Sequence, residues 1–190
     1  MPSPRDDFNE LMERVKQGRE LTHASFEPIY YLVFPPSQIL NVKRELPAWT
    51  AKLHKEGWEV TRFSIAEAVA DLLQSAPLRK LWVDADRKAP LQWKKTNDAI
   101  ANFLSQGVLQ KRLEEALEAL DGRKNAILLV TDLEALHPYL RIGAIESKLE
   151  GKFHVPTVFF YPGLRTGKTR LKFLGFYHED GNYRSVHVGG

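Results

Sequence analysis

Two short apolar runs separated by a polar segment are the feature that most constrains how this chain folds. The first is Ala126–Thr131, and the second is Val155–Tyr161, which is followed by Pro162 and Gly163. Both are continuously apolar and rich in β-branched or aromatic residues, a pattern typical of parallel strands that are buried on both faces. The segment between them includes a helix-like part at Ile142–Gly151 and is long enough for a crossover helix. We therefore predict a βαβ unit at the centre of the chain.

The rest of the sequence extends this unit into a larger α/β arrangement. Further strands are expected at Ile29–Phe34, Trp58–Phe63, Leu171–Phe176 and Tyr183–Val188. Helices are expected at Asp7–Gln17, at Gln38–Lys55 with a kink or split at Pro47, from Ile65 after a Ser64 cap, and at Leu91–Leu120 with a break at Gly107. The segment Pro77–Pro90 fits either strand or helix.

This order of elements predicts a single α/β domain spanning residues 1–190. We expect a mixed, mostly parallel sheet with helices on both faces. The turn-forming segment Glu179–Asn182 lies between the last two expected strands, so we predict that they form a C-terminal antiparallel hairpin.

Composition excludes several classes of protein. The chain has 190 residues, a net charge of +3 and no cysteine, so disulfides, thiolate nucleophiles and cysteine metal sites are ruled out. The mild positive charge permits contact with nucleic acid but does not require it. Neither a signal-peptide core nor an apolar run of about 20 residues is seen, so we expect a cytoplasmic protein without membrane contact.

The segment Gly163–Thr169 (GLRTGKT) invites comparison with a phosphate-binding loop. That motif has four residues between its first glycine and the Gly-Lys-Thr triplet, and it leads into a helix. Here three residues separate the glycines and a strand-like segment follows, so we favour a basic hairpin loop. Asp132 ends a strand, as a magnesium-binding carboxylate does in nucleotide-binding domains, but we favour a role in capping the next helix.

No other pattern in the sequence points to catalysis. Asp84 and Asp86 resemble a carboxylate pair for metal-dependent transfer, although such pairs are also common in solvated segments. The six histidines show no standard metal-ligand spacing, and the sequence lacks a nucleophile elbow. We therefore expect a protein that is not an enzyme and that uses no cofactor and no metal.

A basic cluster lies near the predicted C-terminal hairpin. It consists of Arg165, Lys168, Arg170 and Lys172. These side chains are candidates for contact with nucleic-acid phosphates. The alternative is that they keep an exposed sheet edge from aggregating, and we favour this second interpretation.

Several motifs in the C-terminal third resemble one known family. They are His137–Arg141 after a strand, Val158–Gly163, Leu171–Gly175 and Asn182–Arg184. In this order they resemble the BrxB family, small proteins encoded in BREX bacteriophage-defence operons and formerly described as a domain of unknown function. The N-terminal half matches that family in pattern more than in residues.

The resemblance implies a role in defence and not a particular reaction. It also implies a bacterial protein and a P-loop-like layout without a working phosphate loop. It implies a non-catalytic adaptor that bridges larger subunits, namely a PglZ-like protein and a BrxC-like ATPase. The alternatives are a nucleic-acid-binding module that uses the basic hairpin, and a cryptic nucleotide-binding enzyme around Asp132.

Ligands and partners of parallel sheets gather beyond the carboxyl ends of the strands. His137–Arg141 and Pro162-Gly163 both follow strand ends, so we predict that they line one shared surface. Arg141 and Arg184 could anchor a partner's carboxylate or phosphate, or could instead satisfy acidic or backbone groups within the domain. The candidate interaction residues are His137, Tyr139, Arg141, Pro162, Gly163, Asn182, Tyr183 and Arg184.

Overall fold

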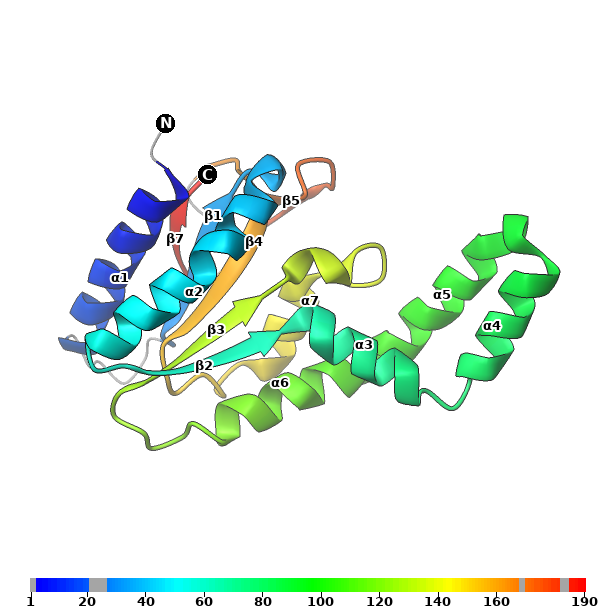
Figure 1. Ribbon diagram of the computed structural model, residues 1–190, viewed down its shortest axis with the longest axis horizontal. Coiled ribbons are helices and arrows are strands. Elements are labelled where there is room, and N and C mark those ends of the chain that lie inside the picture. The colour runs from blue at the N-terminus through cyan, green and yellow to red at the C-terminus, as the bar shows by residue number, and fades with distance from the viewer. Residues whose placement is uncertain (1–2, 21–26, 168–169, 182–184) are drawn as a thin grey trace.

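The computed structural model describes residues 3–20, 27–167, 170–181 and 185–190 (Figure 1). Its helices are α1 (Pro4–Glu20), α2 (Ile39–Lys55), α3 (Ile65–Ser75), α4 (Arg79–Lys88), α5 (Trp93–Phe103), α6 (Leu109–Glu118) and α7 (Ile142–Glu146). Short helical turns are η1 (Pro36–Gln38), η2 (Pro90–Gln92), the π-helical η3 (Leu104–Val108), η4 (Leu133–Leu136) and η5 (Ser147–Leu149). The strands are β1 (Ile29–Phe34), β2 (Glu59–Ser64), β3 (Ala126–Thr131), β4 (Thr157–Arg165), β5 (Leu171–Phe173), β6 (Glu179–Asp180) and β7 (Val186–Gly189).

The predicted α/β fold with a mixed, mostly parallel sheet is confirmed. Strands β2, β3, β4, β1 and β7 lie side by side in that order, and every pairing among them is parallel. Strands β5 and β6 continue the sheet in antiparallel orientation from the end of β4. The central βαβ unit is β3, the crossover through α7 and η5, and β4, as the two apolar runs predicted.

The predicted C-terminal hairpin is wrong in one of its two strands. The antiparallel partner of β5 is the two-residue strand β6, whereas the segment predicted as its partner forms β7 beside β1. Strand β1 is buried along its whole length. An open edge there would leave buried backbone groups without hydrogen bonds, and the parallel pairing with β7 supplies those bonds.

The predicted strand end at Pro162 and Gly163 is also wrong, because β4 continues to Arg165. Pro162 is the last residue of β4 that pairs with β1, opposite Phe34, and the ladder with β5 begins at Gly163. A proline has no amide hydrogen to donate, so it fits at the point where a strand changes partners.

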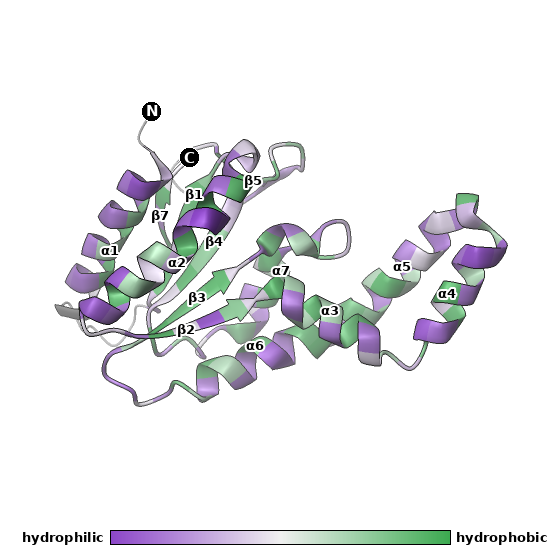
Figure 2. Ribbon diagram, viewed as in Figure 1, coloured by the Kyte–Doolittle hydropathy of each residue, from purple (hydrophilic) through white to green (hydrophobic). Residues whose placement is uncertain are grey.

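Helices cover both faces of the sheet, as predicted, and their apolar sides face inward (Figure 2). On one face, α1 and α2 bury a cluster in which the rings of Phe8 and Trp49 stack 4.4 Å apart, near Phe160 of β4. Pro47 does not split α2, which is one continuous helix. The buried side chains of Leu46 and Trp49 on either side of the proline hold the helix against the sheet.

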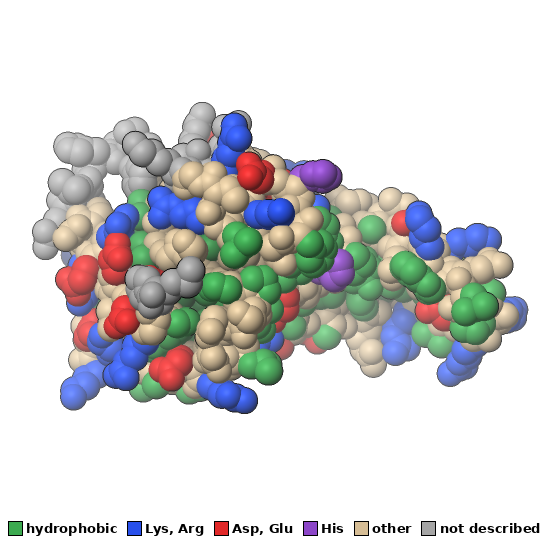
Figure 3. All heavy atoms as spheres, turned by 90° about the horizontal axis from the view of Figure 1, so that it is seen from above, with side chains coloured by type: hydrophobic (Ala, Val, Ile, Leu, Met, Phe, Trp, Pro, Cys, Tyr) green, Lys and Arg blue, Asp and Glu red, His purple; other side chains and the backbone are tan. Residues whose placement is uncertain are grey.

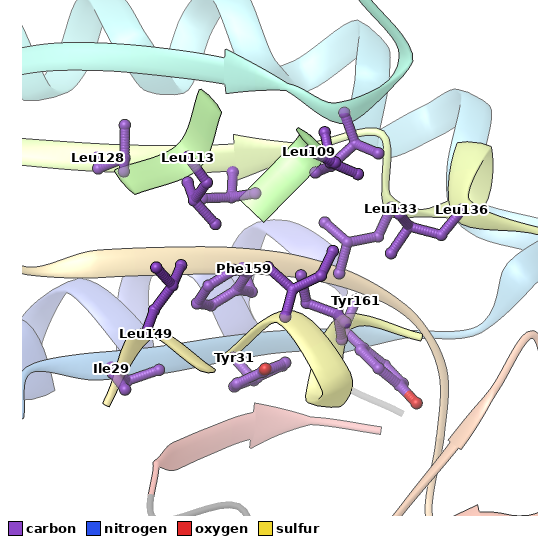
Figure 4. Packing of buried hydrophobic residues seen from close by; sticks show 14 of the residues in the cluster. Ile29, Tyr31, Leu109, Leu113, Leu128, Leu133, Leu136, Leu149, Phe159 and Tyr161 are labelled. Atoms are coloured by element: carbon purple, nitrogen blue, oxygen red, sulfur yellow. The ribbon is translucent and has the colours of Figure 1, made fainter. Parts of the chain in front are cut away.

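The second face carries the larger core, which is covered by α3, α6 and α7. Leu113 of α6 and Leu149 of η5 lie against Leu128 and Phe159 of the central strands (Figure 4). All four side chains are fully buried. Because residues on alternate positions of β3 enter opposite cores, its sequence has to be apolar at every position.

Helices α4 and α5 form an arm that projects from the sheet-covering layers (Figure 1). The ambiguous segment Pro77–Pro90 is thus mainly helical. The rings of Trp82 on α4 and Phe103 on α5 meet edge to face at 5.7 Å. The hydroxyl of Thr96 donates a hydrogen bond to Asp86 across the two helices. None of the helices in the described part of the chain has the length and apolar character needed to cross a lipid bilayer.

Candidate functional site

The segment His137–Arg141 lies beyond the end of β3 and is held in place by the preceding turn η4, which is anchored in the core. Leu133 and Leu136 of η4 are buried in the larger core, and the amides of Tyr139 and Leu140 donate to the carbonyl of Leu136, at 2.7 and 2.9 Å. His137 is exposed, whereas Tyr139 packs against the core. Packing against the core therefore explains the tyrosine at position 139. The side chains of His137 and Arg141, on either side of this part of the segment, are both at least partly exposed.

A turn after β5 brings two aromatic residues to this segment. The amide of Leu174 donates to the carbonyl of Pro162, at 2.9 Å, which fixes the turn against the end of β4. The turn then presents Phe176 and Tyr177, whose rings stack 4.6 Å apart. Pro162 is itself buried, so it anchors this surface without lining it.

His137, Arg141, Phe176 and Tyr177 together form what we call the aromatic rim. A hydrogen bond joins Nδ1 of His137 to the hydroxyl of Tyr177, and the guanidinium carbon of Arg141 lies 3.3 Å from the centre of the Tyr177 ring. Phe176 is 63% exposed at the outer side. His137 and Arg141 thus meet in one rim, whereas Pro162 and Gly163, which were predicted to line the same surface, are both buried. The two aromatic residues were not predicted. Their pairing with His137 depends on chain segments 40 residues apart and left no local signal in the sequence.

Arg141 is the polar residue of the aromatic rim whose side chain makes the fewest hydrogen bonds among the described residues. Its Nη1 is buried and has no hydrogen-bond partner, and no ion pair of Arg141 is formed within the described residues. Stacking on Tyr177 holds the guanidinium in one plane. A planar guanidinium is suited to a carboxylate or phosphate, which it binds by two parallel hydrogen bonds, although a partner group reaches the buried Nη1 only if neighbouring side chains move.

Arg141 also borders a hollow of about 610 Å³ with acidic walls. Its carboxylates are those of Glu27, Glu146, Glu150, Glu179 and Asp180. Burial raises the pKa of Glu146, the negative charge of Glu27 raises it further, and the hydrogen bond donated by the hydroxyl of Tyr31 opposes both effects. No group of three or more acidic or histidine side chains in the described ranges is arranged to hold a metal ion.

Asp132 does not cap the helix that follows it, contrary to prediction. Its carboxylate accepts hydrogen bonds from Ser64 at 2.6 Å and Thr131 at 2.9 Å, and it pairs with Lys43 at 2.8 Å. Lys43 also reaches Glu134, at 2.6 Å. Burial alone would raise the pKa of Asp132, but the hydrogen bonds outweigh it and lower the pKa below its usual value. The carboxylate is thus committed to a network that ties β2, β3 and α2 together.

The glycine- and lysine-containing segment after β4 is a hairpin connection, as expected. It leads into β5, which runs antiparallel to β4, and not into a helix. Gly163 lies within a strand and its φ is not positive, so a turn conformation does not account for the glycine. A Cβ at this position would lie 2.5 Å from the carbonyl oxygen of Lys172 and from the Tyr161 ring. Strand β5 and the Tyr161 ring approach so closely that no side chain fits, which explains why residue 163 is a glycine.

The described members of the predicted basic cluster lie near one glutamate. Arg170 is 3.6 Å from Glu179, and Lys172 lies opposite the same glutamate in the β5–β6 register. Arg165 is exposed and donates to the carbonyl of Gly167, at 3.0 Å. These contacts test neither interpretation of the cluster, so edge protection and nucleic-acid contact both stay predictions. Lys168 and the interaction candidates Asn182, Tyr183 and Arg184 lie outside the described residues.

Comparison with known proteins identifies the family. The model of the family described as BREX protein BrxB matches residues 61–188, which is roughly two thirds of the chain. The chain belongs to the BrxB family. The match extends from β2 to β7, so it includes both the arm and the aromatic rim. Neither the search of curated proteins nor the search of solved structures found a match. Membership in the BrxB family implies involvement in a BREX system and hence in defence against bacteriophage.

Proposed function

We propose that this BrxB-family chain is a non-catalytic adaptor of a BREX system that bridges a PglZ-like and a BrxC-like subunit. The observation that carries the proposal is the aromatic rim, in which Arg141, whose buried Nη1 has no hydrogen-bond partner among the described residues, stacks on Tyr177, and Tyr177 stacks on the exposed Phe176. Aromatic and arginine side chains are the residues that most often dominate the energetics of protein–protein interfaces.

The polar network at the end of the parallel strands supports an adaptor more than an enzyme. Lys43 and Asp132 stand where a nucleotide-binding protein would hold its magnesium, but each neutralises the other, and Ser64 and Thr131 take up the carboxylate's remaining capacity. The pKa of Lys43 is raised, because its bonds to Asp132 and Glu134 outweigh the effect of burial. Both groups stay charged and paired at neutral pH, which is the state of a structural network.

The test measures binding of the purified chain to purified PglZ-like and BrxC-like subunits from the same operon by calorimetry. Phe176→Ser and Arg141→Gln are each expected to weaken binding to one subunit at least about tenfold, because centrally placed aromatic and arginine side chains dominate such interfaces. Arg112→Ser, an exposed arginine on α6, is the control and should bind as the unmodified chain does.

Thermal unfolding of every variant shows whether a loss of binding reflects a loss of fold. Unchanged affinity in both rim variants would remove the aromatic rim from the interface. Magnesium-dependent ATP hydrolysis by the isolated chain, abolished by Lys43→Ala or Lys168→Ala, would replace the adaptor with a nucleotide-hydrolysing enzyme.

A further inference from the structure

The arm carries much of the positive charge of the chain. Six basic and three acidic residues lie between positions 79 and 103, which gives the arm a formal charge of +3, the same as the net charge of all 190 residues. Among the six, only Lys94 is in an ion pair within the described residues, with Asp98 at 3.0 Å. All six are exposed. They are Arg79, Lys80, Arg87, Lys88, Lys94 and Lys95.

The same arm exposes large apolar side chains. Leu91 is 94% exposed and Trp93 is 60% exposed at the turn between α4 and α5, and Leu78 and Leu81 at the start of α4 are 50% and 63% exposed. These are four of the seven large hydrophobic residues that are exposed in the described part of the chain. Figure 3 shows hydrophobic side chains on one face of the arm with lysine and arginine side chains around them.

The inner contacts of the arm explain its shape but not its outer surface. Trp82, Asp86 and Thr96 face the other helix and join α4 to α5. The exposed leucines and Trp93 take no part in those contacts. An apolar surface of this kind, concentrated on a projecting element, is typical of a site where another macromolecule binds.

We propose that the arm is a second docking surface, which binds a protein partner whose surface is acidic and has an apolar groove. The inference rests on the proposed adaptor function. It adds the part of the molecule that binds a second subunit and the chemistry of that contact. The exposed lysine and arginine side chains of the arm, with its net charge of +3, favour acidic groups on the partner. The exposed leucines favour a protein over a nucleic acid, because the phosphate backbone offers a leucine no apolar surface to contact.

The experiment measures binding of the unmodified chain and two arm variants to each of the two purified BREX subunits. Leu91→Ser with Trp93→Ser removes the apolar tip. Lys80→Glu with Lys95→Glu reverses two charges in the first turns of α4 and α5, where glutamate is compatible with the helix dipole, so the helices are retained. Each double variant is expected to weaken binding to one subunit at least about tenfold.

That subunit should differ from the one that loses affinity when the aromatic rim is altered. The matched control is Lys111→Glu with Arg112→Glu, which reverses two exposed charges on α6, and it should leave both affinities unchanged. Affinity of the unmodified chain for the arm's subunit should also fall between about 50 and 300 mM salt, because exposed charges are screened over shorter distances at higher salt.

Three outcomes would overturn the inference in distinguishable ways. If both arm variants bind both subunits as the unmodified chain does, the arm is not a docking surface, and the adaptor proposal stands on the aromatic rim alone. If the unmodified chain binds neither subunit, the adaptor function fails and the inference fails with it. If the arm binds duplex DNA, and the charge reversal abolishes this binding while removal of the apolar tip does not, the partner is a nucleic acid.

Discussion

Asp132 has a backbone conformation that few side chains tolerate, with φ of 61° and ψ of 37°. Asparagine accepts this left-handed region as readily as aspartate does, so Asp132→Asn removes the charge without straining the backbone. We expect it to reduce the free energy of unfolding at pH 7 by about 1 to 2 kcal/mol, because Lys43 loses its buried partner.

The explanation can be checked by measuring how the loss in the free energy of unfolding depends on pH. The folded pKa of Asp132 is lowered, so the stabilisation by its charged form is present above the pKa of an unfolded aspartate, about 3.9, and is lost as the pH falls through the folded pKa. Urea unfolding at a series of pH values should show the two proteins converge toward acid. A difference that stays constant with pH would show that the charge is not the cause.

Gly163 is a position at which the surrounding atoms leave no room for a side chain. Gly163→Ala places a methyl group 2.5 Å from the carbonyl oxygen of Lys172, and backbone of a paired strand cannot move aside cheaply. We expect a loss of roughly 2 kcal/mol in urea unfolding. Gly181→Ala is the control, because its Cβ would meet only Arg170, at 3.8 Å, and it should be nearly neutral. Equal effects at the two positions would contradict the steric explanation.

The arm formed by α4 and α5 depends on a few contacts. Trp82→Ala removes the ring that meets Phe103, and we expect faster amide hydrogen exchange across residues 79–103 while β1, β3 and β4 stay protected. Leu81→Ala alters the neighbouring but 63% exposed residue and should leave exchange unchanged. Faster exchange throughout the sheet would show that the arm and the sheet unfold together.

Strand β7 introduces a buried histidine into the sheet. Burial, with a smaller effect from the nearby charge of Arg165, lowers the pKa of His187 to about 4. The folded protein therefore keeps this ring neutral, and the unfolded chain takes up its proton first, near pH 6.5. Stability is fully present above that pH and falls by up to about 3 kcal/mol as the pH drops toward 4.

A variant isolates the contribution of His187. His187→Gln removes the titrating group, so its free energy of unfolding should change less between pH 7 and pH 4 than that of the unmodified chain. The measurement is denaturant unfolding at each pH. Identical pH profiles would assign the acid sensitivity to other groups.

The parallel strands and the helices over them were predictable because each has a strong local pattern. The run Ala126–Thr131 has to be buried on both faces wherever it folds, and α6 repeats its leucines at helical spacing. The partner of β7 was not predictable, because pairing with β1 joins segments about 150 residues apart and depends on which edge stays open. Local turn signals at Glu179–Asn182 favoured a hairpin that the sheet does not make.

The site was predictable only in part, for the same reason. His137 and Arg141 follow a strand end, and that rule predicted their place. Tyr177 meets them only because the amide of Leu174 is anchored on Pro162, a contact without a sequence signature. Lys43 lies on a helix with no unusual spacing, so its pairing with Asp132 emerges only when α2 packs beside β3.

The position of β1 between β4 and β7 has a consequence during synthesis. Both neighbours of β1 are encoded more than about 120 residues downstream of it. A ribosome that adds roughly 5 to 20 residues per second needs about 6 to 25 seconds to produce the first of them. Throughout that interval the uncharged hexapeptide IYYLVF has two unpaired edges. Newborn copies are therefore exposed to aggregation at this segment, and a chaperone that shields it on the translating ribosome should raise the yield of folded protein.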